Sequence, residues 1–253
     1  MITVVGSLKG GSGKSTITFN LAIWLAMAEV RVAVVDADPQ ATLSDVLQVR
    51  AEEGYKPLVA QVSVDELARG RESVAGYDQV LVDIGTASMD NLKLALSLAD
   101  RILVPVPPSQ ADIWSTQRFL RFVTTQTGGR HVNIQGFINR ADTHRAVRES
   151  DEAAAALVSL PGIQFLKPRL AQRTIFRRSF SEGLAVFEQE PRSKGAAEWN
   201  ALAAALYPEL LSRTPLIGRR SRGLERQCPA FSLLFSIGSS RIWSPLRCVV
   251  SCW

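Results

Sequence analysis

The stretch SLKGGSGKST, residues 7–16, decides the fold of this chain. It follows the apolar run MITVV, which is typical of a buried strand, and it leads into residues 14–27, whose apolar positions recur with helical spacing. A glycine-rich loop between a strand and a helix offers backbone N–H groups and a helix N-terminus to an anion. The stretch therefore predicts a phosphate-binding loop. Such a loop needs one lysine, so the second lysine ahead of the glycines requires its own explanation.

The residue types in this loop indicate how it would hold a nucleotide. Its glycines allow backbone torsions and a close approach that side chains would block. Lys14 is expected to reach the β- and γ-phosphates, and Ser15 is expected to bind Mg²⁺ through its hydroxyl. Leu8 stands where the common G-x-x-x-x-G-K-[ST] pattern has its first glycine, so the motif is a variant. The expected nucleotide-binding residues are Gly10, Gly11, Ser12, Gly13, Lys14, Ser15 and Thr16.

Strand-like and helical segments alternate along the first 211 residues. Apolar runs occupy residues 1–7, 31–38, 77–85, 101–108 and 132–140, and helical patterns fit residues 14–27, 88–98, 110–126, 145–158 and 193–211. Near-continuous apolar strands separated by helices are typical of a parallel sheet that is covered on both faces. We therefore expect an α/β fold, a mostly parallel, twisted sheet with helices on both faces and right-handed crossovers.

The composition changes after residue 211. Residues 212–253 hold seven arginines, a single acidic residue and all three cysteines, so the net charge of +5 comes from this segment and the preceding body is nearly neutral. We expect a P-loop domain over residues 1–211 and a basic Cys/Ser/Arg-rich tail over residues 212–253. Three interpretations of the tail stay open: a disordered or loosely attached extension, the product of an altered reading frame, and a segment that binds a membrane surface.

Acidic residues follow the second and third predicted strands. Asp36 and Asp38 end the run VVDAD, where two carboxylates two residues apart can share one metal–water site. Asp83 follows the apolar residues VLV in YDQVLVDIG, and an acid at the end of such a strand can hold Mg²⁺ through water. The alternative for the first pair is an acidic turn that caps the next helix.

The segment KGGSGKST resembles the deviant Walker A motif of the ParA/MinD class of P-loop ATPases. The resemblance implies that Lys9 reaches across a dimer interface to the partner's nucleotide, whereas Lys14 acts within its own subunit, which explains the second lysine. The segment DADPQ is similar to the class's D-x-D-P-Q segment, which implies that Asp38 orients the attacking water and Asp36 supports Mg²⁺. The third strand resembles a Walker B strand, which assigns Asp83 to Mg²⁺ together with Ser15.

Two later segments extend the resemblance. Asn139 ends GFIN at the place where the class has an asparagine that contacts adenine, although asparagine after a strand is also a common turn residue. The segment PRLAQRTIFRRSFSEGLAVFE resembles the late part of partition ATPases, whose basic residues bind DNA without sequence preference. Arg169, Arg173 and Arg177 are spaced by four and would share one face if the stretch is helical. The alternative is an ordinary solvated face.

The resemblance implies a ParA-type partition ATPase that uses ATP and Mg²⁺. It implies an ATP-dependent homodimer, non-specific DNA binding and a small centromere-binding partner that stimulates hydrolysis. We expect a cytoplasmic, nucleoid-associated protein with no membrane partner, and a MinD-like membrane or cell-envelope positioning ATPase is the alternative. Cobyrinate-amidating enzymes and nitrogenase-like iron proteins need cysteines that residues 1–211 lack. One departure from the class is DIGTAS after the third strand, where many relatives have a proline.

Overall fold

The computed structural model of this chain describes residues 1–144 and 148–210. The predicted tail over residues 212–253 lies outside the described residues, as do residues 145–147 of one predicted helix. The elements are, in chain order, β1 (Ile2–Val5), α1 (Lys14–Met27), β2 (Val32–Asp36), α2 (Thr42–Glu52), β3 (Ala60–Gln61), α3 (Val64–Ala68), η1 (Arg71–Val74), β4 (Gln79–Asp83), α4 (Met89–Leu98), β5 (Arg101–Val106), α5 (Gln110–Gln126), β6 (Asn133–Ala141), α6 (Glu149–Val158), β7 (Gln164–Phe165), β8 (Leu170–Ala171), α7 (Thr174–Ser181), α8 (Val186–Gln189), α9 (Lys194–Leu206) and η2 (Pro208–Leu210).

The described strands form one sheet in the order β3-β2-β4-β1-β5-β6-β7, and β8 pairs with β6. All of these pairings are parallel. The strand order reverses at β1, because the chain first builds outward to β2 and β3 and later continues from β5 on the other side. A sheet of this kind opens a crevice at the carboxyl ends of the strands beside such a reversal. The predicted α/β fold is confirmed.

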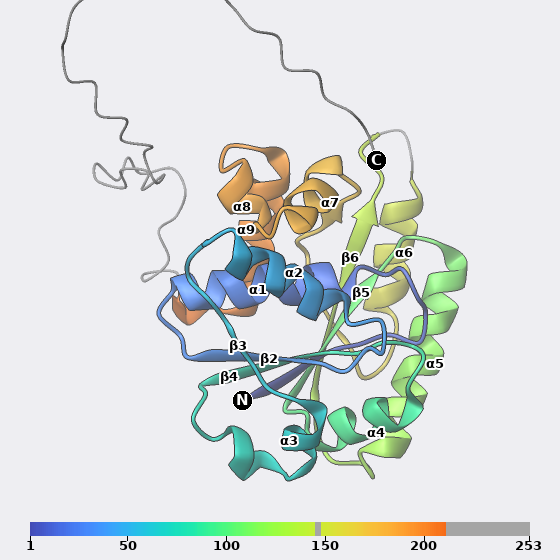
Figure 1. Cartoon of the computed structure of the whole chain (residues 1–253). Helices are drawn as coiled ribbons and strands as arrows, with labels where there is room; N and C mark the ends of the chain where they lie inside the picture. The colour runs from blue at the N-terminus through green and yellow to red at the C-terminus, as the bar shows by residue number, and fades with distance from the viewer. Residues whose placement is uncertain (145–147, 211–253) are drawn as a thin grey trace, which may run out of the picture. The chain divides into compact units, whose positions relative to one another are not determined.

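Helices cover both faces of the sheet (Figure 1). One apolar cluster joins one face of the sheet to α1, α2, α7, α8 and α9. A second cluster joins the opposite face to α3, α4, α5 and α6. Because both faces are buried, the central strands need apolar side chains at successive positions, which is why they read as continuous apolar runs in the sequence.

Helix α1 is buried on almost every side, which suits a helix that lies between the sheet and other helices. Phe19 packs edge-to-face on Phe180 of α7, with 5.5 Å between ring centroids. Asn20 accepts a hydrogen bond from the backbone N–H of Val186 at 2.8 Å. These contacts fix the helix that follows the phosphate-binding loop, so the loop is attached to a rigid element. The predicted helix over residues 14–27 is confirmed.

Two buried arginines join distant elements. Arg50 of α2 is fully buried and donates to the carboxylate of Glu188 and to the carbonyl oxygens of Pro57 and Gly183. Arg101 of β5 donates to Thr3 Oγ1, to the Leu206 carbonyl and to the Tyr207 hydroxyl. Burying a guanidinium is costly unless its N–H groups find acceptors, as both do here. The first network joins α2 to α8, and the second joins β5 to the end of α9.

Candidate nucleotide-binding site

The loop between β1 and α1 lies at the carboxyl end of the central strand. Gly13 occupies the N-cap of α1 with φ 90°, and Gly11 has φ 75°, both in the left-handed region that favours glycine. A Cβ on Gly13 would lie 2.6 Å from Nδ2 of Asn139, closer than real contacts allow. Both glycines are therefore required by the path of the loop, as the sequence predicts.

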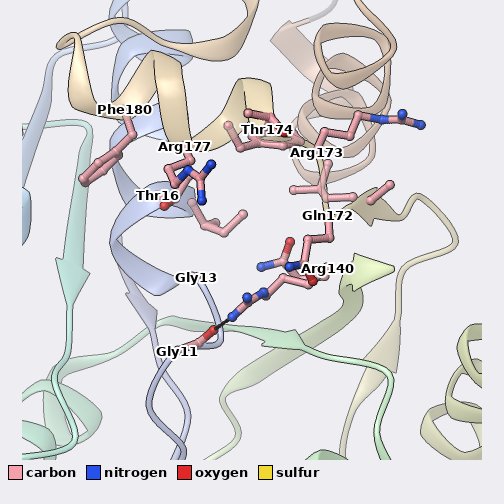
Figure 2. A pocket seen from close by; sticks show the side chains of 14 residues that line it. Gly11, Gly13, Thr16, Arg140, Gln172, Arg173, Thr174, Arg177 and Phe180 are labelled. Carbon is pink, nitrogen blue, oxygen red and sulfur yellow. Dashed lines mark hydrogen bonds between the residues drawn. The ribbon is translucent and has the colours of Figure 1, made fainter. Parts of the chain in front are cut away.

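Two side chains from the end of β6 hold the loop's carbonyl groups outward. Arg140 donates from Nη1 to the Gly11 carbonyl oxygen at 2.6 Å (Figure 2), and Asn139 donates from Nδ2 to the Ser12 carbonyl oxygen at 2.6 Å. In a planar trans peptide the C=O and the following N–H point in opposite directions. The N–H groups of Ser12 and Gly13 therefore point away from these two side chains and are not used by them, so they are left for a phosphate.

Asn139 thus has a structural contact that the sequence does not predict. The amide nitrogen of Asn139 is hydrogen-bonded to the loop, and the residue also lines the adjoining cavity. The predicted adenine contact stays a prediction. No role for Arg140 is predicted from the sequence. The φ angle of Arg140, 57°, is unusual for a residue other than glycine. The only sequence signal for this residue is its place directly after Asn139.

The two lysines of the loop lie in different surroundings. Lys14 is 7% exposed, and its Nζ donates to the Lys9 carbonyl oxygen at 3.4 Å. Burial lowers the pKa of Lys14, and the nearby carboxylates of Asp83 and Asp38 act against this shift. The side chain of Lys9 is 47% exposed, and its Nζ lies 2.9 Å from Oδ1 of Asp112 in α5. The buried lysine therefore points into the site, and the exposed lysine points toward its own subunit's α5.

Asp83 is a buried carboxylate without a hydrogen-bond partner among the described residues. It is 1% exposed at the end of β4, beside Val5 of β1 and Asp36 of β2. Burial raises the pKa of Asp83 to about 7; the Ser15 side chain opposes the shift and the charge of Asp36 adds to it. An unsatisfied buried carboxylate next to a hydroxyl suits Mg²⁺, which prefers oxygen ligands and retains several waters. The predicted residues Ser15 and Asp83 therefore fit this ion.

Asp36 and Asp38 shape the segment after β2. Asp36 accepts hydrogen bonds from the backbone N–H and hydroxyl of Ser44, at 2.8 and 3.0 Å, so it holds the first turn of α2. Asp38 accepts from the Gln40 backbone N–H at 3.0 Å and lines a cavity of about 440 Å³ with Lys14 and Ser15. Asp38 is thus placed at the loop as predicted. The helix-capping alternative describes the contacts of Asp36, whose metal role stays a prediction.

A second cavity, of about 380 Å³, adjoins the loop between β6, β8 and α7 (Figure 2). Its size suits a small-molecule ligand. Ile17, Leu170, Phe176 and Phe180 supply apolar surface, and Thr16, Gln172 and Arg177 supply polar groups. Because this cavity continues from the phosphate-binding loop, it can take the nucleoside part of a nucleotide.

The three arginines predicted to share a helical face do not do so. α7 begins at Thr174, so only Arg177 lies in it, and the predicted helical face is wrong. Arg169 pairs with Asp151 at 2.6 Å, and Arg173 turns away from the cavity (Figure 2) to pair with Glu198 of α9 at 2.6 Å. The short strand β8 intervenes, which spacing alone does not reveal. Arg177 points into the cavity and has no ion pair among the described residues.

No group of three or more His, Cys, Asp or Glu side chains in residues 1–144 and 148–210 is arranged to hold a metal ion. In the same ranges no helix has both the length and the apolar character needed to cross a membrane.

The sequence matches the model of one protein family. The match covers residues 3–186 and the family is described as the CobQ/CobB/MinD/ParA nucleotide-binding domain. The chain is 31% identical over 195 residues to "Maintenance of carboxysome distribution protein A" of Gloeobacter kilaueensis, with 75% of this chain and 85% of that protein covered. It is 38% identical over 128 residues to the chromosome-partitioning ATPase Soj of Thermus thermophilus. This alignment covers 39% of this chain and 51% of Soj.

Solved structures show the same fold. The structure of apo McdA from Cyanothece superposes with a TM-score of 0.67 at 19% identity, and 81% of this chain and 98% of that chain are covered. The cell division ATPase MinD of Pyrococcus furiosus superposes with a TM-score of 0.65 at 20% identity, and 82% of this chain and 98% of that chain are covered. At these identities the likeness establishes the fold.

Proposed function

Because this chain belongs to the CobQ/CobB/MinD/ParA family of nucleotide-binding domains, we propose that it is an ATPase that positions a cargo and dimerises when it binds ATP. The observation that carries the proposal is the geometry at the loop. Two consecutive loop N–H groups point away from Asn139 and Arg140, a buried lysine lines the cavity at the loop, and the buried carboxylate of Asp83 has no hydrogen-bond partner among the described residues. This combination suits a nucleoside triphosphate and its divalent cation.

The residues divide the work of binding and hydrolysis. Lys14 contacts the β- and γ-phosphates, and Ser15 and Asp83 hold Mg²⁺, with Asp36 supporting the segment beside them. When bound, the ion offsets charge on the phosphates. Asp38 orients the attacking water, because it lies at the same cavity as Lys14 and Ser15 and its carboxylate is a suitable acceptor. The remaining loop residues and Asn139 hold the nucleotide in place.

Lys9 acts on the nucleotide of a second copy of the chain. A further cation at the γ-phosphate would stabilise the charge that develops as the γ-phosphoryl group is transferred to water. It would also make dimerisation depend on ATP, so that the nucleotide state works as a switch. A centromere-binding or cargo-bound partner protein that stimulates hydrolysis would reset the switch.

The surface on which the dimer acts is DNA of the nucleoid in this proposal. Arg178 is exposed, lacks an ion pair among the described residues and lies on α7, next to Arg177, whose side chain faces the cavity beside the loop. The partners of Arg169 and Arg173 leave those two residues less free to bind phosphate groups. Similar proteins include a carboxysome-distribution protein and a chromosome-partitioning ATPase, so the cargo is a DNA molecule or a large protein body. The alternative is a membrane or cell-envelope surface, as for MinD.

Lys9→Ala in the full-length chain tests the switch. It should retain nucleotide binding as a monomer, because Lys14 is intact, and lose dimerisation with ATP and Mg²⁺. Light scattering would measure the mass. A dimer of Lys9→Ala as stable as the wild-type dimer would show that Lys9 does not act across the interface.

A second experiment tests DNA as the positioning surface. The full-length chain should bind random duplex DNA with ATP and not with ADP, and binding should weaken steeply as salt rises, because phosphate contacts release counterions. The tail carries seven arginines and is the same in every sample, so the comparison between nucleotides isolates the effect of dimerisation. Equal binding with ATP and ADP would show that dimerisation does not create the DNA-binding surface, and binding to anionic vesicles but not to DNA would favour the membrane alternative.

A further inference from the structure

Lys9 is held by a carboxylate of its own chain. Its Nζ lies 2.9 Å from Oδ1 of Asp112, which is 6% exposed in the first turn of α5. The Ser109 hydroxyl donates to Oδ2 of the same carboxylate. A helix N-terminus also favours negative charge at this position. Asp112 is therefore a fixed, buried acceptor, and Lys9 is its more exposed partner.

The carboxylate of Asp112 is not needed to begin α5. The N-cap is Ser109, whose Oγ accepts the backbone N–H of Asp112 at 3.2 Å. Lys9 and Asp112 both line a cavity of about 560 Å³ at the outer side of the loop, together with Arg140 and Glu149. The ion pair therefore lies at the edge of a cavity and not in the closed core, and the side chain of Lys9 is half-exposed there.

We propose that Asp112 is a positioning residue that keeps Lys9 in its own subunit until ATP and a second subunit draw it away. The inference rests on the proposed function, in which Lys9 acts on the partner's nucleotide. One ammonium group cannot pair closely with Asp112 and with a triphosphate in another subunit at the same time. Forming the dimer therefore breaks two of these ion pairs. Asp112 opposes dimerisation, and only a ligand with enough negative charge overcomes it, which favours ATP over ADP.

The test compares Asp112→Asn with a matched control, Glu149→Gln. Both changes remove one negative charge from the same cavity, but Glu149 is exposed and has no ion pair among the described residues. Sedimentation velocity of the full-length chains, with Mg²⁺ and a non-hydrolysable ATP analogue, measures the dimer dissociation constant. Breaking one half-exposed ion pair changes an equilibrium constant by roughly threefold. Because two are broken, Asp112→Asn should lower the constant about tenfold, while the control changes it less than about twofold.

The outcomes separate this inference from the function on which it rests. If Lys9→Ala dimerises normally, the proposed role of Lys9 is wrong. If Lys9→Ala fails to dimerise but Asp112→Asn behaves like the control or dimerises more weakly, the role of Asp112 is overturned and that of Lys9 stands. If Lys9→Ala fails and Asp112→Asn dimerises about tenfold more tightly, both are supported.

A second measurement does not depend on dimerisation. An amine-reactive acylating reagent should modify Lys9 of the nucleotide-free protein slowly in the wild type and several times faster in Asp112→Asn, because the ammonium loses its partner. Mass spectrometry of the peptide that contains Lys9 gives the rate. Asp112→Glu, which keeps the charge, should restore slow modification. Equal rates in all three proteins would overturn the inference.

Discussion

Replacing Asp83 by Asn should stabilise the nucleotide-free protein and abolish its use of Mg²⁺. The carboxylate is 1% exposed and has no hydrogen-bond partner among the described residues, and burial raises its pKa to about 7. The folded protein therefore holds a proton between about pH 4 and pH 7 that the unfolded chain has released. The wild type consequently loses free energy of unfolding as the pH rises through this window, and Asp83→Asn does not.

The size of this effect follows from the shift. A change of about three pKa units corresponds to about 4 kcal/mol, at 1.36 kcal/mol for each unit. The advantage of Asp83→Asn should therefore be small near pH 4 and approach about 4 kcal/mol at pH 8. Carboxylates whose pKa is lowered, such as Asp78 and Asp100, act in the opposite direction but are common to both proteins and cancel in the comparison.

Urea denaturation in the presence of a chelator, at several pH values, would measure this difference. With an m-value of about 3 kcal/mol/M, the midpoints at pH 8 should differ by roughly 1 M urea or more. Asp65→Asn, at an exposed position of α3, is the matched control and should follow the wild type. Mg²⁺ should strengthen ATP binding by the wild type and not by Asp83→Asn. A variant that is less stable than the wild type at pH 8, or that still responds to Mg²⁺, would refute the reasoning.

Three further variants test the arrangement around the loop. Gly85→Ala should leave ATP binding intact but slow hydrolysis roughly 10- to 100-fold in steady-state assays. The new Cβ would lie 2.3 Å from the carboxylate carbon of Asp38 and would displace that side chain. Unchanged turnover would contradict this expectation. Arg140→Ala should weaken calorimetric affinity for both ATP and ADP about tenfold, since one loop carbonyl loses its donor; unaltered affinity would show that the loop needs no such support. Arg177→Ala should weaken ATP binding whereas Arg178→Ala should not, and equal effects would show that the cavity does not face the nucleotide.

Much of the fold could be predicted from the sequence because the signals are local. The helix over residues 14–27 and the strands that contain Asp36 and Asp83 follow from apolar periodicity and occur as expected. The two-residue strands β3, β7 and β8 carry no periodicity and were not predicted. β8 is the reason why Arg169, Arg173 and Arg177 do not share a helical face, since it ends only three residues before α7 begins.

The site could be predicted in part, for a similar reason. Glycine, lysine and acidic residues near strand ends indicate a phosphate-binding loop from their order alone, and the structure places Lys14, Ser15 and Asp38 around one cavity. Contacts between residues far apart in the chain have no such signal. Arg140 reaches the loop across 129 positions, and Asp112 is 103 positions from Lys9. Residue type does not reveal these partners.

Mixing two inactive variants tests the central claim most directly. Lys14→Ala should not bind ATP but keeps Lys9, and Lys9→Ala should bind ATP but cannot supply the second cation. If Lys9 acts across the interface, a mixed dimer contains one complete site, and ATP hydrolysis should reappear when the two are combined at concentrations well above the wild-type dimer dissociation constant. If each lysine serves its own subunit, no site is complete. A mixture as inactive as its separate components would contradict the account.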